Sequence, residues 1–295
     1  MKERTAYPAA QVNMAKSSHT SSHTGTLAPL RVNGRLGKYR LDRRIGQGGF
    51  ADVYAATDTL LSIKVALKIP NAQWVSDELI NEFRREAKLT MGLEHPNILA
   101  IRDASFIDGR FVIVTPLASR TLDDRLKNRM GFDTAFDFTG QLLSAVSYAH
   151  GQGVIHCDIK PENVMLFDTD HLRLGDFGIA KAAQRTIKGS GTGTLGYMAP
   201  EQAMGKPSKR SDVFSLGLIA YRMFSGKWPE YPFEWPFPGS ASMRKRVHPD
   251  LIAIIRKSVS IKPRDRFADA DKMEAAWEKS RLKATRFAKR NRKTA

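Results

Sequence analysis

The sequence has little cysteine, few acidic residues and no long apolar run. Its 295 residues include one cysteine, Cys157, which excludes a disulfide framework and cysteine-rich metal sites and suits a reducing compartment. No stretch approaches the roughly 20 apolar residues of a membrane-spanning helix, and the N-terminus lacks the apolar core of a signal peptide. We therefore expect a cytoplasmic protein without a membrane span.

Basic residues outnumber acidic ones by 47 to 30, and the net charge is +17. Residues 1–38 hold six Lys or Arg against one Glu, and residues 279–295 hold eight with no acidic residue, so the two ends together carry +13 of the +17. The basic C-terminal segment predicts an anionic partner, which nucleic acid, anionic lipid or an acidic substrate would each satisfy through counterion release. A tail that only aids solubility is the alternative.

The order of segments predicts one two-lobed domain between two tails. Residues 1–37 are rich in Ser, Thr and His, a composition that predicts a disordered tail with hydroxyls open to self-phosphorylation. Residues 38–278 carry every motif described below and are numerous enough for two cores. We expect a small lobe over about 38–115, a larger lobe over about 119–278, and a basic extension over 279–295.

A predicted hairpin is the most informative segment. Two strand-like runs, 164–167 and 171–174, flank a turn-forming Asp-Thr-Asp. Pairing the inner ends of these runs places Asn163 opposite Gly175, so the Asn163 amide and the Asp176 carboxylate emerge side by side. Hard oxygen ligands in this arrangement suit Mg²⁺.

Two charged residues precede the hairpin, Asp158 and Lys160. An acceptor hydroxyl placed beside them would meet a carboxylate, an ammonium group and a metal-bound phosphate together, as phosphoryl transfer requires. A surface turn rich in Asp and Asn is the alternative, which the combined spacing disfavours.

Two motifs here resemble the catalytic loop and the metal-binding segment of eukaryotic-type (Hanks-type) Ser/Thr protein kinases: His156-Cys157-Asp158-Ile159-Lys160-Pro161-Glu162-Asn163 and Asp176-Phe177-Gly178. The resemblance implies an α+β, bilobal fold, with a small β-rich lobe that bears one regulatory helix and a larger, mainly helical lobe. It implies ATP and Mg²⁺ as cofactors, with Mn²⁺ as an alternative metal, and proteins with Ser or Thr acceptors as substrates. Asp158 and Lys160 would be catalytic, and Asn163 and Asp176 would hold the metal.

An upstream run resembles the glycine-rich loop that covers ATP in these kinases. The resemblance assigns nucleotide contacts to Ile45, Gly46, Gln47, Gly48, Gly49 and Val53. Missing side chains let backbone amides approach phosphates. Ala51 replaces the third glycine of the family pattern.

Strand alternation indicates which lysine contacts the phosphates. In residues 65–69 the apolar side chains Val, Leu and Ile share one face, and Ala66 and Lys68 share the other. Lys68 is therefore the first candidate for the ATP phosphates and Ala66 for the adenine pocket. Lys64, on the same face as Lys68, is the second candidate.

A helix is predicted from Ser76, as N-cap, to about Leu93, with an apolar stripe of Leu79, Phe83 and Ala87. Glu86 falls within about 20° of Leu79 at 3.6 residues per turn. A carboxylate on a buried face needs a partner, and Lys68 is the expected one. This pairing matches the ion pair that marks an active kinase conformation.

Residues 115–118 resemble the hinge between kinase lobes. The Thr115 carbonyl and the Leu117 backbone would bind adenine, because Pro116 lacks an amide hydrogen. Further along, residues 193–201 resemble the end of the activation segment, and Thr194 together with Lys160 implies Ser or Thr acceptors.

Two structural contacts are expected in the larger lobe. Glu201 should pair with Arg266, with Arg264 as the less favoured partner. Residues 213–221 are apolar on nearly every side and predict a buried helix, capped by Ser211, whose Asp212 would tie it to the catalytic loop.

Cys157 departs from the family pattern, because most such kinases have Arg at this position. In those kinases the Arg guanidinium binds phosphate on the activation loop and orders it. We therefore predict weak dependence on activation-loop phosphorylation, with Thr186, Ser190 and Thr192 as candidate autophosphorylation sites. A redox role for Cys157 is less favoured than that of a small buried residue.

Two functions remain open: an active Ser/Thr kinase, and a nucleotide-binding pseudokinase that acts as a scaffold, with nucleic-acid contacts through the basic tail. Lys68, Glu86, Asp158, Asn163 and Asp176 are all present. Since loss of one or more of these is typical of a pseudokinase, the sequence favours the enzyme.

Overall fold

The computed structural model describes residues 29–49, 51–71, 76–168, 170–177 and 195–293. The described residues from Arg31 onward belong to one structural unit. Within the described ranges, no helix combines the length and the apolar character needed to cross a bilayer.

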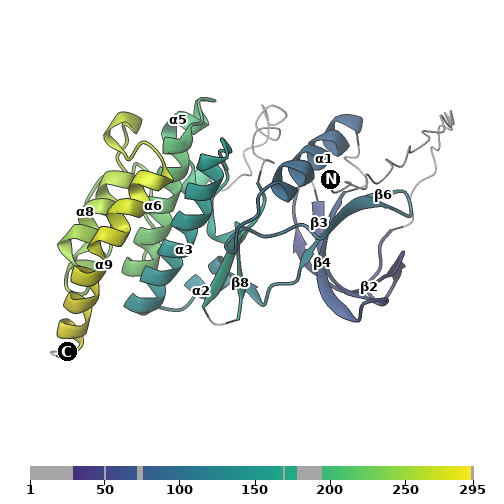
Figure 1. The fold of residues 1–295 in the computed structure, drawn as a ribbon, viewed down its shortest axis with the longest axis horizontal. Coiled ribbons are helices and arrows are strands. Elements are labelled where there is room, and N and C mark those ends of the chain that lie inside the picture. Colours follow the sequence, from purple (N-terminus) through teal and green to yellow (C-terminus); the bar gives the residue numbers. More distant parts are fainter. Residues whose placement is uncertain (1–28, 50, 72–75, 169, 178–194, 294–295) are drawn as a thin grey trace, which may run out of the picture. The chain divides into compact units, whose positions relative to one another are not determined.

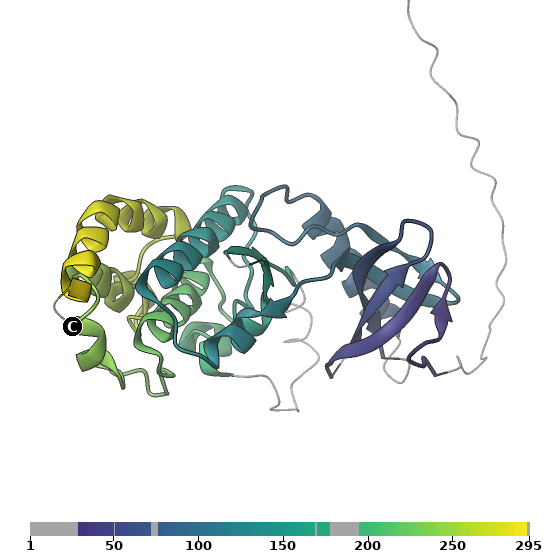
Figure 2. The same cartoon turned by 90° about the horizontal axis from the view of Figure 1, so that it is seen from below.

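The small lobe is built on a six-stranded antiparallel sheet in the order β1-β2-β3-β4-β6-β5. Figures 1 and 2 show its purple and blue strands gathered apart from the green and yellow helices. Its strands are β1 (Arg35–Leu36), β2 (Tyr39–Gln47), β3 (Ala51–Asp58), β4 (Ile63–Pro70), β5 (Asp103–Ile107) and β6 (Arg110–Pro116). The alternation predicted for β4 is present: its three apolar residues at 65, 67 and 69 are buried, whereas Ala66 and Lys68 are half-buried on the opposite face.

Helix α1 (Asp77–Met91) packs on this sheet, with the Phe83 ring 6.5 Å from that of Phe111. Ser76 caps it as predicted, because its hydroxyl accepts a hydrogen bond of 3.2 Å from the Leu79 amide. The buried face consists of Ile80, Phe83, Glu86, Ala87 and Thr90. Glu86 therefore faces inward, as the helical period predicts, while Leu79 is only partly buried.

The larger lobe is mainly helical. It contains α2 (Leu122–Leu126), α3 (Phe132–Gly151), α5 (Pro200–Ala203), α6 (Lys209–Ser225), α7 (Ser240–Arg244), α8 (Pro249–Ser258) and α9 (Ala270–Lys293). A three-stranded sheet is formed by β7 (Arg120–Thr121), β8 (Val164–Phe167) and β9 (His171–Leu174), and single 3₁₀ turns lie at η2 (Pro161–Asn163), η3 (Leu195–Tyr197) and η4 (Pro263–Asp265).

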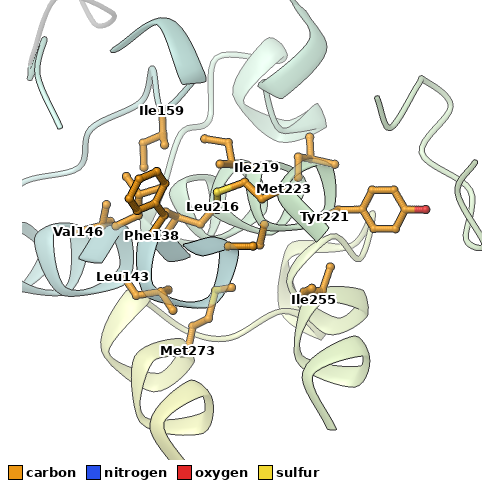
Figure 3. Packing of buried hydrophobic residues seen from close by; sticks show 14 of the residues in the cluster. Phe138, Leu143, Val146, Ile159, Leu216, Ile219, Tyr221, Met223, Ile255 and Met273 are labelled. Atoms are coloured by element: carbon orange, nitrogen blue, oxygen red, sulfur yellow. The ribbon is translucent and has the colours of Figure 1, made fainter. Parts of the chain in front are cut away.

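Helix α6 contributes to the main core of this lobe (Figure 3). Every residue from 211 to 221 is buried, as the all-round apolar pattern predicts. Gly217 permits close packing, since a Cβ there would lie 2.7 Å from the Ser258 side chain. The N-cap is Ser208 rather than the predicted Ser211, because the helix begins at Lys209 and Ser211 instead accepts a hydrogen bond from the Ser208 amide, 3.1 Å.

The C-terminal helix runs through the predicted start of the extension at residue 279. Helix α9 is continuous from Ala270 to Lys293 and packs against α3. Its inward side chains continue past that point as Ser280, Ala284 and Ala288, all buried. These residues are too small to give a visible apolar stripe, yet their size lets the helix lie close to its neighbours, so at least residues 279–288 belong to the packed core.

Candidate active site

The β8–β9 hairpin has the predicted register. Val164 pairs with Leu174 and Phe167 with His171. At the open end the Gly175 amide donates a hydrogen bond of 2.9 Å to the Asn163 carbonyl. The backbone therefore brings residues 163 and 176 to the same end of the hairpin.

Asp212 of α6 anchors the catalytic loop. Its Oδ2 accepts a hydrogen bond of 2.8 Å from the His156 amide, and its Oδ1 accepts one of 2.9 Å from the Cys157 amide. The His150 ring donates a third from Nε2, at 2.9 Å, because its Nδ1 accepts from the Ala270 amide. The contact predicted between this helix and the loop is thus present, and it also includes the end of α3 and the start of α9.

Asp158 is held by two polar neighbours. Its Oδ2 lies 2.9 Å from Lys160 Nζ and accepts a hydrogen bond of 3.0 Å from Asn163 Nδ2. The side chain is 35 % exposed. The carboxylate is therefore fixed in orientation and still accessible to an incoming hydroxyl.

Asn163 and Asp176 fit a magnesium site by their donor chemistry. Both hydrogen bonds of the Asn163 amide use its nitrogen, which leaves the amide oxygen as a ligand. Asp176 pairs with Lys68 through Oδ1 and leaves Oδ2. Among the described residues no cluster of three or more His, Cys, Asp or Glu could hold a metal, so phosphate oxygens and water would complete the coordination that Mg²⁺ prefers.

Lys68 contacts two carboxylates. Its Nζ lies 3.2 Å from Glu86 Oε1, which is the predicted ion pair, and 2.7 Å from Asp176 Oδ1. Lys64, the second candidate, has another partner: it donates to Asp42 Oδ2 at 2.8 Å and to Thr57 Oγ1 at 2.8 Å. The geometry therefore favours Lys68 as the lysine of this site.

The residues predicted to bind nucleotide lie on neighbouring strands. Val53 of β3 pairs with Lys68 of β4, and Ala66 of β4 pairs with Thr115 of β6. Residues 45–47 of the glycine-rich run end β2, and the Gly48 amide donates a hydrogen bond of 2.9 Å to the carbonyl of Ala51, the first residue of β3. These positions converge on one end of the sheet, although Ile45 is 40 % exposed.

Residues 39–277 match the family model described as the protein kinase domain. The chain belongs to the protein kinase family. This kinase is 33 % identical over 276 residues to Ser/Thr-protein kinase PrkC of Bacillus subtilis, covering 85 % of this chain and 42 % of the relative. It is 38 % identical over 206 residues to PknA of Mycobacterium tuberculosis, covering 65 % and 48 %. It is 32 % identical over 258 residues to a probable Ser/Thr-protein kinase of Clostridium acetobutylicum, covering 80 % and 39 %.

The chain spans less than half the length of these curated relatives. Among solved structures it is similar to the PknI kinase domain of Mycobacterium tuberculosis, with a TM-score of 0.63 and 26 % identity, covering 85 % of this chain and 99 % of that one. It also resembles PpkA in its apo form, with a TM-score of 0.71, 21 % identity and coverage of 84 % and 99 %. The predicted bilobal α+β kinase fold is confirmed.

Other predicted contacts of the kinase domain are present or fall outside the structure. Arg266 binds Glu201 through two parallel hydrogen bonds of 2.7 and 3.0 Å, whereas the Arg264 side chain is 81 % exposed. The predicted positions Thr186, Ser190, Thr192 and Thr194 lie outside the described residues, as does most of the N-terminal tail.

Two groups of contacts were not foreseen from the sequence. His156 donates from Nε2 to the Gly175 carbonyl at 2.9 Å, and its ring lies 4.5 Å from that of Phe177. Arg222 donates to Tyr197 Oη at 2.8 Å and to Asp123 Oδ1 at 3.1 Å. The His156 motif position could have suggested its partner, but nothing in the sequence connects three residues as distant as those around Arg222.

The carboxylates around Lys68 differ in their acidity. Burial raises the pKa of Glu86 to about 7, because Lys68 offsets only part of the desolvation and Asp176 adds repulsion. Glu86 Oε2 is buried without a hydrogen-bond partner among the described residues. Burial would also raise the pKa of Asp176, but the charge and hydrogen bond of Lys68, together with His156 and Lys160, outweigh burial and lower that pKa.

We predict that Glu86 makes the stability of the magnesium-free kinase fall as pH rises. The pKa of this carboxyl is about 7 in the folded chain and 4.5 ordinarily, so the folded state binds more protons between these values. Its contribution is complete below about pH 4.5, declines above it, and is lost beyond about pH 7. The unfolding free energy of the wild type minus that of Glu86→Gln should therefore fall by up to about 3 kcal/mol from low to neutral pH.

Urea denaturation of both proteins in EDTA at a series of pH values measures this difference. EDTA is needed because a metal on Asp176 would remove the repulsion that Glu86 experiences. A difference that stays constant or increases with pH would contradict a raised pKa for Glu86.

Proposed function

We propose that this chain is an ATP-dependent protein kinase that phosphorylates Ser and Thr hydroxyls of proteins, its own included. The observation that carries the proposal is that two groups of charged and polar side chains lie at the open end of the β8–β9 hairpin. Lys68 binds both Glu86 and Asp176, while Asp158 binds Lys160 and Asn163 at the open end of the same hairpin. The names of the relatives support Ser/Thr specificity.

Different residues of the chain would bind the phosphates, the metal and the adenine. Bound Mg-ATP supplies the phosphoryl group and part of the positive charge that the reaction needs. Lys68, fixed by two carboxylates, would bind the α and β phosphates, and Asn163 and Asp176 would hold the metal. Hinge backbone at Thr115 and Leu117 would bind adenine.

Asp158 would orient the acceptor hydroxyl and take its proton. Lys160, 2.9 Å from that carboxylate, is placed to neutralise charge on the γ-phosphate as it moves. Because the transition state is loose, most of the rate should come from positioning and charge neutralisation rather than from strong deprotonation.

Phosphate transfer from labelled ATP tests the proposal, with the protein itself and myelin basic protein as acceptors. Asp158→Ala and Lys68→Ala should each lower transfer by at least about 100-fold, since one removes the base and the other a phosphate contact. Lys64→Ala is the matched control, because this lysine lies on the same strand but pairs with Asp42, and it should retain activity. ATP binding without transfer by the wild type would instead indicate a pseudokinase scaffold.

We also propose that activity depends weakly on activation-loop phosphorylation. Cys157 is buried and its side chain has no cationic group, so residue 157 cannot bind a phosphate as an arginine would. The combined substitution of Thr186, Ser190 and Thr192 by Ala should therefore leave transfer to myelin basic protein within about threefold of the wild type. Mass spectrometry would verify that the variant is unphosphorylated there, and loss of activity with an intact fold would contradict the proposal.

Helix α9 supports a second proposal, that the kinase binds nucleic acid. Its exposed cations are Lys279, Arg281, Lys283, Arg286, Lys289 and Arg290. Buried Ala284 and Ala288 hold these charges along one ordered helix. Leu282 is a single exposed apolar side chain among them, which gives no apolar face for insertion into a membrane. A polyphosphate backbone matches such a row of cations.

Binding of a fluorescent DNA duplex over a range of salt concentrations tests this second proposal. Replacing Lys279, Lys283, Arg286, Lys289 and Arg290 by Gln should reduce the slope of log affinity against log salt by about 4. Replacing five exposed cations of the small lobe (Arg31, Arg35, Arg40, Arg43 and Arg85) by Gln is the control. A larger effect of the control, or binding to anionic vesicles alone, would exclude nucleic acid as the partner of α9.

A further inference from the structure

Cys157 adopts a backbone conformation that side chains disfavour. Its φ is 65°, in the left-handed region, where a Cβ approaches the following carbonyl oxygen. Such a residue persists only when its surroundings hold it there. The strain lies directly before Asp158, the proposed base.

Hydrogen bonds hold both ends of the peptide unit that joins Cys157 to Asp158. Its carbonyl oxygen accepts a bond from Gln202 Nε2. Its N–H, which belongs to Asp158, donates to His156 Nδ1 at 3.2 Å. The preceding N–H, of Cys157, donates to Asp212 Oδ1 at 2.9 Å. The plane of the peptide is therefore fixed from opposite sides.

Gln202 is unusual among these partners. It is a polar side chain only 3 % exposed, in the short helix α5, directly after residues 193–201, which resemble the end of the activation segment. The Asp212 contact lies on a different helix, and the His156 contact lies within the loop itself. Gln202 thus supplies the link between the activation-segment end and the peptide that carries the base.

We propose that Gln202 is a positioning residue for Asp158. Its neutral amide links the end of the activation segment to the catalytic loop, and this link requires no phosphate group. The inference rests on the proposed kinase activity. If Gln202 is shortened, the strained peptide is free to rotate and takes the Asp158 carboxylate with it. Asn163 moves too, since its amide is bonded to Asp158.

The position of Gln202 predicts a selective kinetic effect. Lys68, Glu86 and Thr115 lie on the small-lobe elements β4, α1 and β6, and among the described residues no hydrogen bond or ion pair joins them to Gln202. ATP affinity should therefore be preserved while the rate of transfer falls. A substitution that merely loosened the core would instead lower thermal stability without this separation of kcat from KM.

The test uses Gln202→Asn, which keeps the amide but is too short by one methylene, and Gln202→Met, which removes it. Each should lower kcat about tenfold while the KM for ATP stays within about twofold. Thr139→Val is the control, because it removes a buried hydrogen bond of 2.7 Å, to the Ala135 carbonyl, away from the loop. This control should reduce stability and leave kcat unchanged.

Rescue supplies the decisive comparison. Glycine adopts a positive φ without steric cost, so Cys157→Gly should make the loop independent of Gln202. In that background, adding Gln202→Asn should change kcat by less than about threefold. An equal loss of kcat in both backgrounds, or no loss in either, would overturn the proposal.

Hydrogen exchange separates this inference from the proposed function. Amides of residues 156–163 should exchange faster in Gln202→Asn than in the wild type, and return toward the rate of Cys157→Gly alone in the double variant. This readout does not require catalysis. If the wild type transfers no phosphate but the exchange pattern holds, the kinase proposal fails and the positioning role stands; an unchanged exchange rate would refute the positioning role itself.

Discussion

The structure depends most on the buried carboxylate of Asp212, which is 1 % exposed. A buried charge is costly unless its oxygens are satisfied, and here three N–H donors satisfy them. The donors come from the end of α3 and from two successive residues of the catalytic loop. One side chain of α6 therefore fixes the backbone of the loop at residues 156 and 157. The β8–β9 hairpin follows this fixed segment in the chain.

The two lobes meet electrostatically at Lys68. The small lobe supplies this ammonium group together with Glu86, and the larger lobe supplies Asp176. Two carboxylates share one cation, and the pKa of Glu86 is raised mainly by burial and further by repulsion from Asp176. A divalent metal on Asp176 would offset that repulsion, so this group of side chains favours a bound cation.

Much of this arrangement was predictable because it follows from the short repeat of side-chain direction along strands and helices. The strand period of two turned Lys68 away from the lobe core, the helical period turned Glu86 inward, and the hairpin register joined residues 163 and 175. Fold class followed from motifs that resemble those of a known family. Each of these inferences needs only residues that are near one another in the chain or in a familiar order.

The remaining features were not predictable, because they depend on contacts between distant segments. Gln202 and Cys157 are 45 residues apart, and a buried glutamine leaves no mark in a hydrophobic pattern. The burial of Ser280, Ala284 and Ala288 was equally hard to predict, because small residues allow α9 to pack closely without giving it an apolar pattern. The N-cap of α6 was misplaced by three residues because Ser208 and Ser211 are chemically equivalent choices.

The ring of His150 gives α9 a mechanical connection to the catalytic loop. This ring accepts a hydrogen bond from the amide of Ala270, the first residue of α9, and donates one to the Asp212 carboxylate that holds the loop. The first residue of α9 is therefore linked through one side chain, His150, to the Asp212 carboxylate that anchors the loop. Movement of the first turn of α9 would therefore be transmitted through the His150 ring to Asp212, and from Asp212 to the backbone of residues 156 and 157.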